Sequence, residues 1–236
     1  MPMLATVINA LAIVVGSMLG LLIKKGLSKR YEHAIFAAAG VITLVLGMKM
    51  AFATTHILAF ALALIIGGLI GTVLDIEGGV LRLGEFLKSR FAKHEDDGNF
   101  AYGFLSASVL FCSGAMAILG SFRAGTEGDY SLLLTKSVLD GFLSMLFASA
   151  MGAGVAFSAL SVFAYQGALT LLSVWAKPYV TTLMLNELTG VGGALILMIG
   201  IGLLDLRKMK TGDFLPALVI TILLVVAMPY VPFLAK

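Results

Sequence analysis

The chain has 236 residues with a mean hydropathy of +1.04; 60% of the residues are hydrophobic, 12% are charged, and the formal charge is +3. That composition excludes a soluble globular domain and is typical of a helical membrane protein with several spans. The single cysteine, Cys112, excludes an internal disulfide framework. Because little chain is left outside the bilayer, we expect the functional site to lie within it.

The apolar runs predict an all-α polytopic fold with eight transmembrane helices in a single membrane domain, residues 1–236. A helix needs about 20 residues to cross about 30 Å of hydrocarbon. Runs of suitable length cover residues 3–23, 34–52, 57–75, 100–121, 131–152, 155–176, 190–206 and 213–233. In the first and third of these, the pairs Gly16/Gly20 and Gly67/Gly71 favour close packing against other helices.

Basic residues predict the orientation of these spans. Eleven of the 16 Lys and Arg residues fall in three short loops, which follow spans one, three and seven. They are Lys24, Lys25, Lys29, Arg30, Arg82, Lys88, Arg90, Lys93, Arg207, Lys208 and Lys210. Since basic loops stay in the cytoplasm, eight spans place all three loops there and both termini outside.

Residues 79–92 predict an amphipathic helix on the cytoplasmic surface of the membrane. Apolar side chains repeat there at helical spacing, and polar side chains fall on the opposite side. The apolar set is Val80, Leu83, Leu87 and Phe91, and the polar set is Arg82, Glu85 and Ser89.

The sequence contains an internal repeat with an offset of 153 residues. Gly40–Gly47 aligns with Gly193–Gly200, and the same offset places spans one and three onto spans six and eight. Repeat one covers residues 3–76, a central pair of helices covers 100–152, and repeat two covers 155–233. Because the central pair adds two crossings to the three of repeat one, the copies run in opposite directions. Inverted repeats are typical of secondary transporters, although duplication without transport is the alternative.

Lys136 and Asp140 place two charges one helical turn apart inside the fifth span, with Ser144 one turn further on. An ionisable group in the hydrocarbon costs about 2.5–3.5 kcal/mol and is a functional candidate by default. At 1.5 Å per residue from Ser131, Asp140 lies about 13 Å deep. Lys136 lies about 7 Å deep, where it can extend to the outer surface. The alternative is a self-neutralising pair that only locks two helices together.

Three other groups of polar or small residues complete the candidate site. Ser113 and Gly114 permit an unwound or re-entrant stretch in the fourth span, or simply close helix packing. Residues 181–190 predict a short helix that dips from the outer face, with Asn186, Glu187 and Thr189 beside a glycine run. Glu187 is then an ion or proton site, or else an exposed loop acid. Asn9 in span one and Gln166 in span six are expected to be buried and bonded between helices, or else to line a cavity.

The motifs that the sequence lacks exclude other classes of protein. It has no Gly-rich phosphate loop followed by Lys and Ser/Thr, and no His-Glu-x-x-His zinc helix. We therefore expect no ATP-driven pump, no enzymatic activity, no cofactor and no metal site. The net charge reflects loop placement and gives no reason to expect a nucleic-acid partner.

The central region resembles a known bacterial family. The segments 110–121 (LFCSGAMAILGS), 128–131 (GDYS) and 136–141 (KSVLDG) are similar to the signature of the YqgA/YdfK-like inner-membrane proteins, a domain of unknown function (DUF554). The similarity extends to Ile8-Asn9 and to residues 214–217 (FLPA). The resemblance implies a location in the bacterial inner membrane and brings no substrate with it.

Together these features predict an ion-coupled secondary transporter of a small solute. Its site is expected between Ser113-Gly114, the Lys136/Asp140 helix and the Asn186–Thr189 segment. Asp140 is the candidate for a coupling Na⁺ or H⁺, with Lys136 as its counter-charge. A thin bundle of this kind is expected to form a homodimer in the lipid bilayer. A channel, and a scaffold or sensor without transport, are the alternatives.

Overall fold

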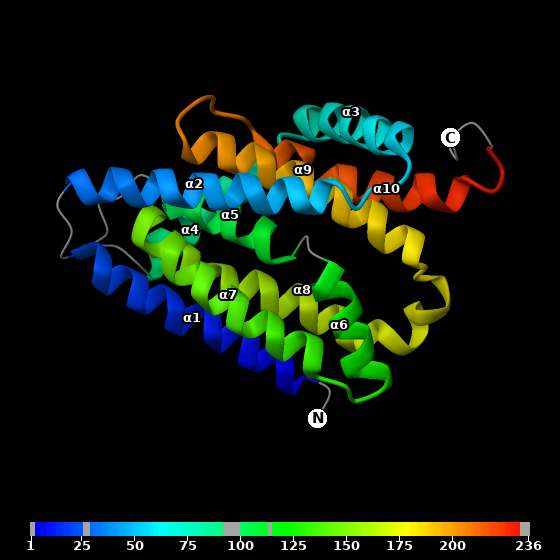
Figure 1. Cartoon of the computed structure of the whole chain (residues 1–236), viewed down its shortest axis with the longest axis horizontal. Coiled ribbons are helices and arrows are strands. Elements are labelled where there is room, and N and C mark those ends of the chain that lie inside the picture. The colour runs from blue at the N-terminus through cyan, green and yellow to red at the C-terminus, as the bar shows by residue number, and fades with distance from the viewer. Residues whose placement is uncertain (1–2, 26–28, 92–99, 113–114, 232–236) are drawn as a thin grey trace. The chain divides into compact units, whose positions relative to one another are not determined.

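The computed structural model describes residues 3–25, 29–91, 100–112 and 115–231, and in those residues it contains helices and no strand. Figure 1 traces them from the N-terminus to the C-terminus. The longer helices are α1 (Leu4–Lys25), α2 (Lys29–Ala51), α3 (Ile57–Leu74), α4 (Ile76–Phe91), α5 (Phe100–Cys112), α6 (Ala115–Thr126), α7 (Ser131–Met151), α8 (Gly154–Ala176), α9 (Thr182–Leu203) and α10 (Pro216–Ala227). Two 3₁₀ turns, η1 (Lys177–Tyr179) and η2 (Thr211–Phe214), precede α9 and α10.

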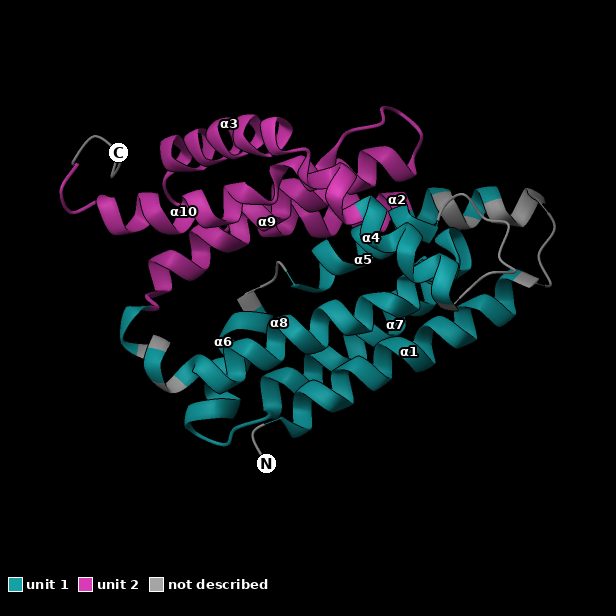
Figure 2. Ribbon diagram, turned by 180° about the vertical axis from the view of Figure 1, so that it is seen from behind, with its two compact units in different colours: residues 1–39, 81–112, 116–179 teal, residues 40–80, 113–115, 180–236 magenta. Residues whose placement is uncertain are grey.

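The chain forms two compact units, drawn in different colours in Figure 2. Unit 1 comprises Met1–Ala39, Leu81–Cys112 and Met116–Tyr179. Unit 2 comprises Gly40–Val80, Ser113–Ala115 and Val180–Lys236. Each unit draws on both halves of the sequence, so neither corresponds to a single repeat.

Several of these helices can span a membrane. Among the described residues, α1, α3, α7, α8 and α9 are long and apolar enough, and α5 with α6 forms a sixth candidate that bends by 59°. The predicted spans 34–52 and 213–233 contain shorter apolar helices, Ala37–Ala51 and Thr211–Ala227. The structure therefore supports five or six spans, and the number eight stays a prediction.

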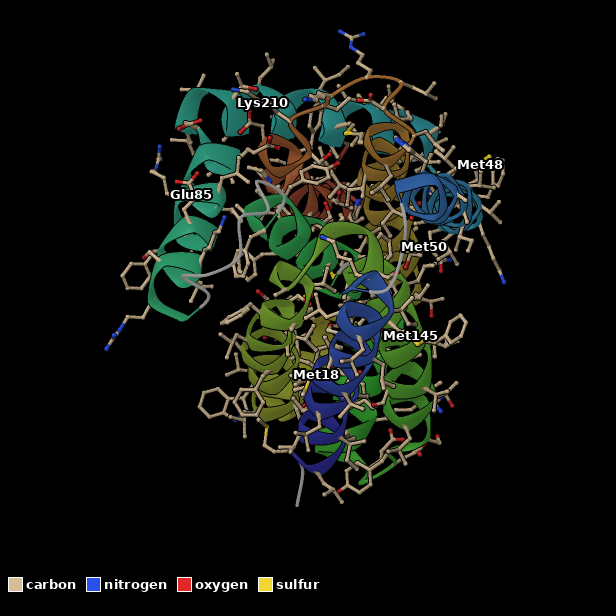
Figure 3. The ribbon with its side chains drawn as sticks, turned by 90° about the vertical axis from the view of Figure 1, so that its left-hand side faces the viewer. Met18, Met48, Met50, Glu85, Met145 and Lys210 are labelled. Carbon is tan, nitrogen blue, oxygen red and sulfur yellow. The ribbon has the colours of Figure 1, made fainter. Side chains whose placement is uncertain are left out.

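The outward sides of these helices are apolar, as lipid contact requires. On α1, Leu11, Val15 and Met18 are more than half exposed, and so is Val138 on α7. Figure 3 labels Met18 on α1 beside Met145 on the neighbouring α7. Large exposed side chains of this kind are unfavourable in water and favourable in hydrocarbon.

Small residues bring α1 and α7 into direct backbone contact within unit 1. A side chain on Gly16 would overlap the carbonyl oxygen of Gly141, and one on Gly20 would overlap that of Met145. Both members of each pair advance by four residues, so the helices run parallel. In unit 2, Gly67 and Gly71 of α3 likewise leave no room for a side chain, against Ala217 and Asp213. The packing interpretation of both glycine pairs is confirmed.

In unit 2, α2 and α9 cross in antiparallel contact through four glycines. At each glycine, an added side chain would overlap the facing helix or the residue that ends it. The close pairs, in order along the crossing, are Gly40 with Leu204, Leu44 with Gly200, Gly47 with Leu197 and Ala51 with Gly193.

The predicted short helix over 181–190 is wrong, because α9 is one continuous helix from Thr182 to Leu203. Thr181 caps it: the side-chain oxygen accepts a hydrogen bond from the backbone N–H of Met184. The glycine run does not break the helix, because Gly190 lies against Thr54 and Gly193 against Ala51. These glycines serve close packing rather than flexibility.

The predicted amphipathic helix exists as α4 and begins at Ile76, three residues before the predicted start. Its two sides differ from the prediction. Leu83 is 50% exposed and Phe86 is 62% exposed, whereas Val80 and Leu87 are half-buried. Two apolar side chains thus lie on the same exposed side of α4 as Arg82 and Arg90.

Candidate functional site

Lys136 and Asp140 form an ion pair inside unit 1. The ammonium Nζ of Lys136 donates to Oδ2 of Asp140, and each residue is 5% exposed. The predicted extension of Lys136 toward the outer surface is wrong. The carboxylate one turn away holds the side chain inward, and Nζ lies 5.8 Å from the ring centroid of Phe111 on α5.

Asn9 connects this pair to two other helices. Its amide Nδ2 donates to Asp140 Oδ2 at 3.1 Å and to Gln166 Oε1 at 3.0 Å. Gln166 Nε2 in turn donates to the hydroxyl oxygen of Thr6 at 3.3 Å. The prediction that Asn9 and Gln166 bond between helices is thereby confirmed, and the structure shows that they bond to each other. We call Thr6, Asn9, Lys136, Asp140 and Gln166 the Asp140 network.

One buried acceptor in the Asp140 network is unused. The side-chain oxygen Oδ1 of Asn9 is buried and has no hydrogen-bond partner among the described residues. Asn9 itself is completely buried, and so is Thr6. Because unpaired buried polar atoms are rare in folded proteins, this oxygen marks a place where the network can take another donor.

Ser144 takes part in packing rather than in the network. Its hydroxyl lies 3.1 Å from the carbonyl oxygen of Ile13 and 2.8 Å from that of Gly141. Both carbonyl oxygens belong to the close α1–α7 crossing. The hydroxyl of Ser144 therefore stabilises the contact one turn below Asp140.

The predicted residues Ser113 and Gly114 lie outside the described residues. The helices on either side are described: α5 ends at Cys112, and α6 follows after a bend of 59°. Phe111, the residue whose ring faces Lys136, is in the last turn of α5. The Asp140 network thus contacts the helix that ends at this bend.

Glu187 lies in unit 2 and is 1% exposed, so the interpretation as an exposed loop acid is wrong. Its Oε1 accepts from the backbone N–H groups of Thr55 at 2.8 Å and His56 at 3.1 Å. The Thr55 hydroxyl donates to Oε1 at 2.9 Å, and the Thr54 hydroxyl donates to Oε2. The imidazole Nδ1 of His56 also lies 3.2 Å from Oε1. The carboxylate caps the segment that leads into α3, where N–H groups lack helical partners.

The neighbours of Glu187 do not extend this cluster. The hydroxyl of Thr189 donates to the carbonyl oxygen of Leu185 within α9 at 2.6 Å, and Asn186 is half-buried. Asn9, Lys136 and Asp140 come together in unit 1, whereas Asn186, Glu187 and Thr189 belong to unit 2. That the two groups form one site stays a prediction.

A pair of carboxylates in unit 2, Glu77 and Asp213, was not predicted. Asp213 Oδ1 accepts from the backbone N–H of Glu77 at 2.9 Å, and Glu77 Oε2 accepts from that of Gly212 at 2.8 Å. Partial burial raises the pKa of Glu77 and outweighs the hydrogen bond from Gly212. The spacing of these residues in sequence, about 135 positions, gives no local signal of the contact.

Comparison with known families identifies the family of this chain. The family described as "Protein of unknown function (DUF554)" matches residues 4–226. The chain belongs to the DUF554 family. The resemblance seen in residues 110–141 is confirmed, and the protein is a membrane protein of an uncharacterised family.

Two relatives of this DUF554 protein span nearly its whole length. The Bacillus subtilis (strain 168) protein named "Uncharacterized membrane protein YdfK" is 37% identical over 224 residues, which cover 92% of this chain and 93% of the relative. The Escherichia coli (strain K12) protein named "Uncharacterized protein YqgA" is 29% identical over 216 residues, which cover 90% and 92%. No solved structure matches the chain.

Proposed function

We propose that this DUF554 protein is an ion-coupled secondary transporter of a small solute, with the Asp140 network as its ion site. The observation that carries the proposal is a charged pair, buried among membrane helices, that joins side chains from α1, α7 and α8. Such residues mark ion and proton pathways in membrane proteins. The protein acts as a carrier rather than as an enzyme.

The α2–α9 crossing supports an inverted repeat. Shifting both residues of the pair Gly40–Leu204 by 153 positions, in opposite directions, gives Gly193–Ala51, which is also a close pair. The pair Gly47–Leu197 becomes Gly200–Leu44 in the same way. When the shift maps each contact onto another contact with the two helices exchanged, the two helices are related by a two-fold axis. Since the helices are antiparallel, the axis is perpendicular to them, as in inverted repeats.

The helix boundaries agree with the same offset. Shifted by 153, α2 covers 182–204, and α9 covers Thr182–Leu203. Shifted by 153 in the same way, α3 covers 210–227, and η2 with α10 covers Thr211–Ala227. Shifted α1 covers 157–178, and α8 covers Gly154–Ala176. The register supports three related helices in each copy.

The proposal includes an orientation and a location. The protein lies in the bacterial inner membrane, its three basic loops are cytoplasmic, and both termini are outside. A homodimer is part of the proposal as well. Cysteine-accessibility labelling of single-cysteine variants in intact cells tests the orientation, with Cys112 replaced by Ala.

A purely structural role for the Asp140 network is the competing explanation. A buried ion pair is weak evidence for stability, because apolar side chains of similar volume are often as favourable. The network also leaves Asn9 Oδ1 unpaired, which costs stability. A network that does not maximise stability is better explained by ion binding than by packing.

The test begins with the purified protein and its ligands. Thermal unfolding is measured against a panel of ions and metabolites, since a ligand that binds the folded state raises the midpoint. The solute found is then offered, in radiolabelled form, to proteoliposomes under an ion gradient. Wild type and Glu187→Gln are expected to accumulate it, whereas Asp140→Asn inserts, folds and does not. Gradient-driven accumulation by Asp140→Asn at the wild-type rate would remove Asp140 from the mechanism. Conductance far above carrier turnover would make the protein a channel.

A further inference from the structure

We infer that the coupling ion is a proton carried by the Asp140 carboxylate, and that Lys136 occupies the position a sodium ion would need. This inference rests on the proposed function and specifies the ion for the same site. It follows from the groups that donate hydrogen bonds to the carboxylate and from the ability of those groups to change their hydrogen-bond roles.

The two hydrogen bonds that the Asp140 carboxylate accepts within the described residues both come from N–H donors. Oδ2 accepts from the ammonium of Lys136 and from the amide Nδ2 of Asn9. A hard cation such as Na⁺ binds oxygen ligands. The ammonium is already a cation on that oxygen, and it is tethered to the same helix. A sodium ion would have to displace Lys136 and be repelled by it at short range.

A proton can bind Asp140 without displacing Lys136 and without several oxygen ligands. It forms one O–H bond with a carboxylate oxygen of Asp140, while the Lys136 ammonium keeps its own three protons. The pair then changes from zero net charge to one positive charge. The attraction that holds the Lys136 side chain against Asp140 is lost, so the two protonation states favour different side-chain positions.

The Asp140 network can accept this proton without losing its connectivity. Asn9 turns its amide so that Oδ1, unpaired at present, faces the new O–H group. Gln166 turns in the same way and donates to Asn9 Oδ1 through Nε2. The Thr6 hydroxyl, now an acceptor from Gln166, then donates to Gln166 Oε1. Amides and hydroxyls can exchange roles in this manner.

The other titratable groups on the helices around Asp140 do not compete for this proton. The α5 helix carries Cys112, at its end, and Tyr102; α8 carries Tyr165. Thiols and phenols ionise only at alkaline pH. The titratable side chains of α1 are Lys24 and Lys25, at its C-terminal end. The α6 helix, whose Ala124 packs with Leu133 of α7, carries Arg123, and its guanidinium lies 3.6 Å from the carboxylate of Asp129. Asp140 is therefore the group on these helices that can exchange a proton with a partner cation beside it.

Infrared difference spectroscopy of the purified protein in lipid tests the inference without a known solute. Spectra are recorded while the pH is lowered, and the signal is the carbonyl stretch of a protonated carboxylic acid. Asp140→Asn is expected to lose one such band. Lys136→Met is expected to show the band at a higher pH, by about 1–3 units, because the opposite charge has been removed.

The matched control is Glu187→Gln, which replaces another buried carboxylate by the same kind of amide. It is expected to keep the Asp140 band at the wild-type pH. A parallel arm compares wild-type thermal unfolding in NaCl and in choline chloride of equal ionic strength, and no difference is expected. This arm needs no variant to fold.

The experiments distinguish a failure of the proton inference from a failure of the proposed ion site. A sodium-specific rise in the unfolding midpoint, present in wild type and absent in Asp140→Asn, would overturn the proton inference and keep Asp140 as an ion site. An Asp140 band that does not respond to pH, together with no sodium effect, would overturn both the inference and the proposed site. Loss of the band in Asp140→Asn, with its shift in Lys136→Met, supports the proton.

Discussion

Asp140 and Glu187 are buried carboxylates with very different surroundings, one in each unit. Glu187 accepts hydrogen bonds from backbone N–H groups and from threonine hydroxyls at the start of α3, and Nδ1 of His56 lies 3.2 Å from its Oε1. Asp140 accepts from a lysine ammonium and from one amide. The two backbone donors to Glu187 are fixed by the fold, whereas both donors to Asp140 are side chains that can turn away. For this reason Asp140, and not Glu187, is the proposed ion site, although both acids are buried.

The electrostatic consequences differ as well. The backbone N–H groups around Glu187 stabilise a negative charge from fixed positions, as N–H groups do at helix N-termini. The charge of Asp140 depends on one side chain, Lys136. Variants that disrupt the surroundings of each carboxylate in turn allow the two acids to be compared.

Removing Lys136 is expected to have the largest effect on stability. Lys136→Met leaves Asp140 buried without its counter-charge, and truncating one partner of a buried pair costs about 3–5 kcal/mol. The double variant Lys136→Met/Asp140→Asn should recover most of that loss, because no unpaired charge remains. Unfolding of Lys136→Met, Asp140→Asn and the double variant in detergent, each compared with wild type, completes the double-mutant cycle. A double variant as unstable as Lys136→Met would show that the pair acts through packing instead.

Neutralising Glu187 is expected to have an intermediate effect. Glu187→Gln keeps one side-chain oxygen as an acceptor and loses the charge-assisted hydrogen bond at the other oxygen, which contributes about 1.5–3 kcal/mol. Because the loss is local, amide hydrogen exchange should quicken at Thr55 and His56 and stay unchanged along α7. Faster exchange along α7 would contradict the assignment of Glu187 as a local anchor of α3.

Two carboxylates outside the spans are expected to give small and opposite pH effects. Hydrogen bonds from Ser131, at the start of α7, lower the pKa of Asp129. Asp129 therefore adds stability above its unfolded pKa, and that stability is lost as the pH falls through the folded value. Burial raises the pKa of Glu77, so stability decreases as the pH rises from about 4.5 through the folded value.

Thermal unfolding between pH 3 and pH 7, about the range of these carboxyl groups, separates the two effects. Asp129→Asn should flatten the acidic part of the wild-type profile, whereas Glu77→Gln should flatten the part above it. A Glu77→Gln profile parallel to that of wild type would mean that partial burial does not govern this group.

The sequence predicted the parts of the site that local spacing controls. Lys136 and Asp140 pair because four residues separate them on one helix. Gly16 and Gly20 predicted close packing from their spacing in the same way. Asn9 and Gln166 were predicted to bond between helices because amides are costly in hydrocarbon and such partners offset the cost, but the sequence did not show that they bond to each other.

Other features depend on distant residues and left no local signal. The partners of Glu187 lie 131–133 positions away in sequence, so its role as a cap could not be predicted. The glycine run after Thr189 predicted a break, because nothing local shows that α2 covers it. The contribution of Thr6 had a weak signal: it lies three residues before Asn9, on the same side of α1.

Gradient-driven uptake by the Asp140→Asn variant tests the central claim most directly. Proteoliposomes with wild type, Asp140→Asn or Glu187→Gln receive the solute identified by thermal unfolding, under a pH gradient. We expect accumulation with wild type and with Glu187→Gln, and none with Asp140→Asn, although all three proteins are folded and inserted. Equal accumulation by wild type and Asp140→Asn would contradict the assignment of the Asp140 network as the ion site.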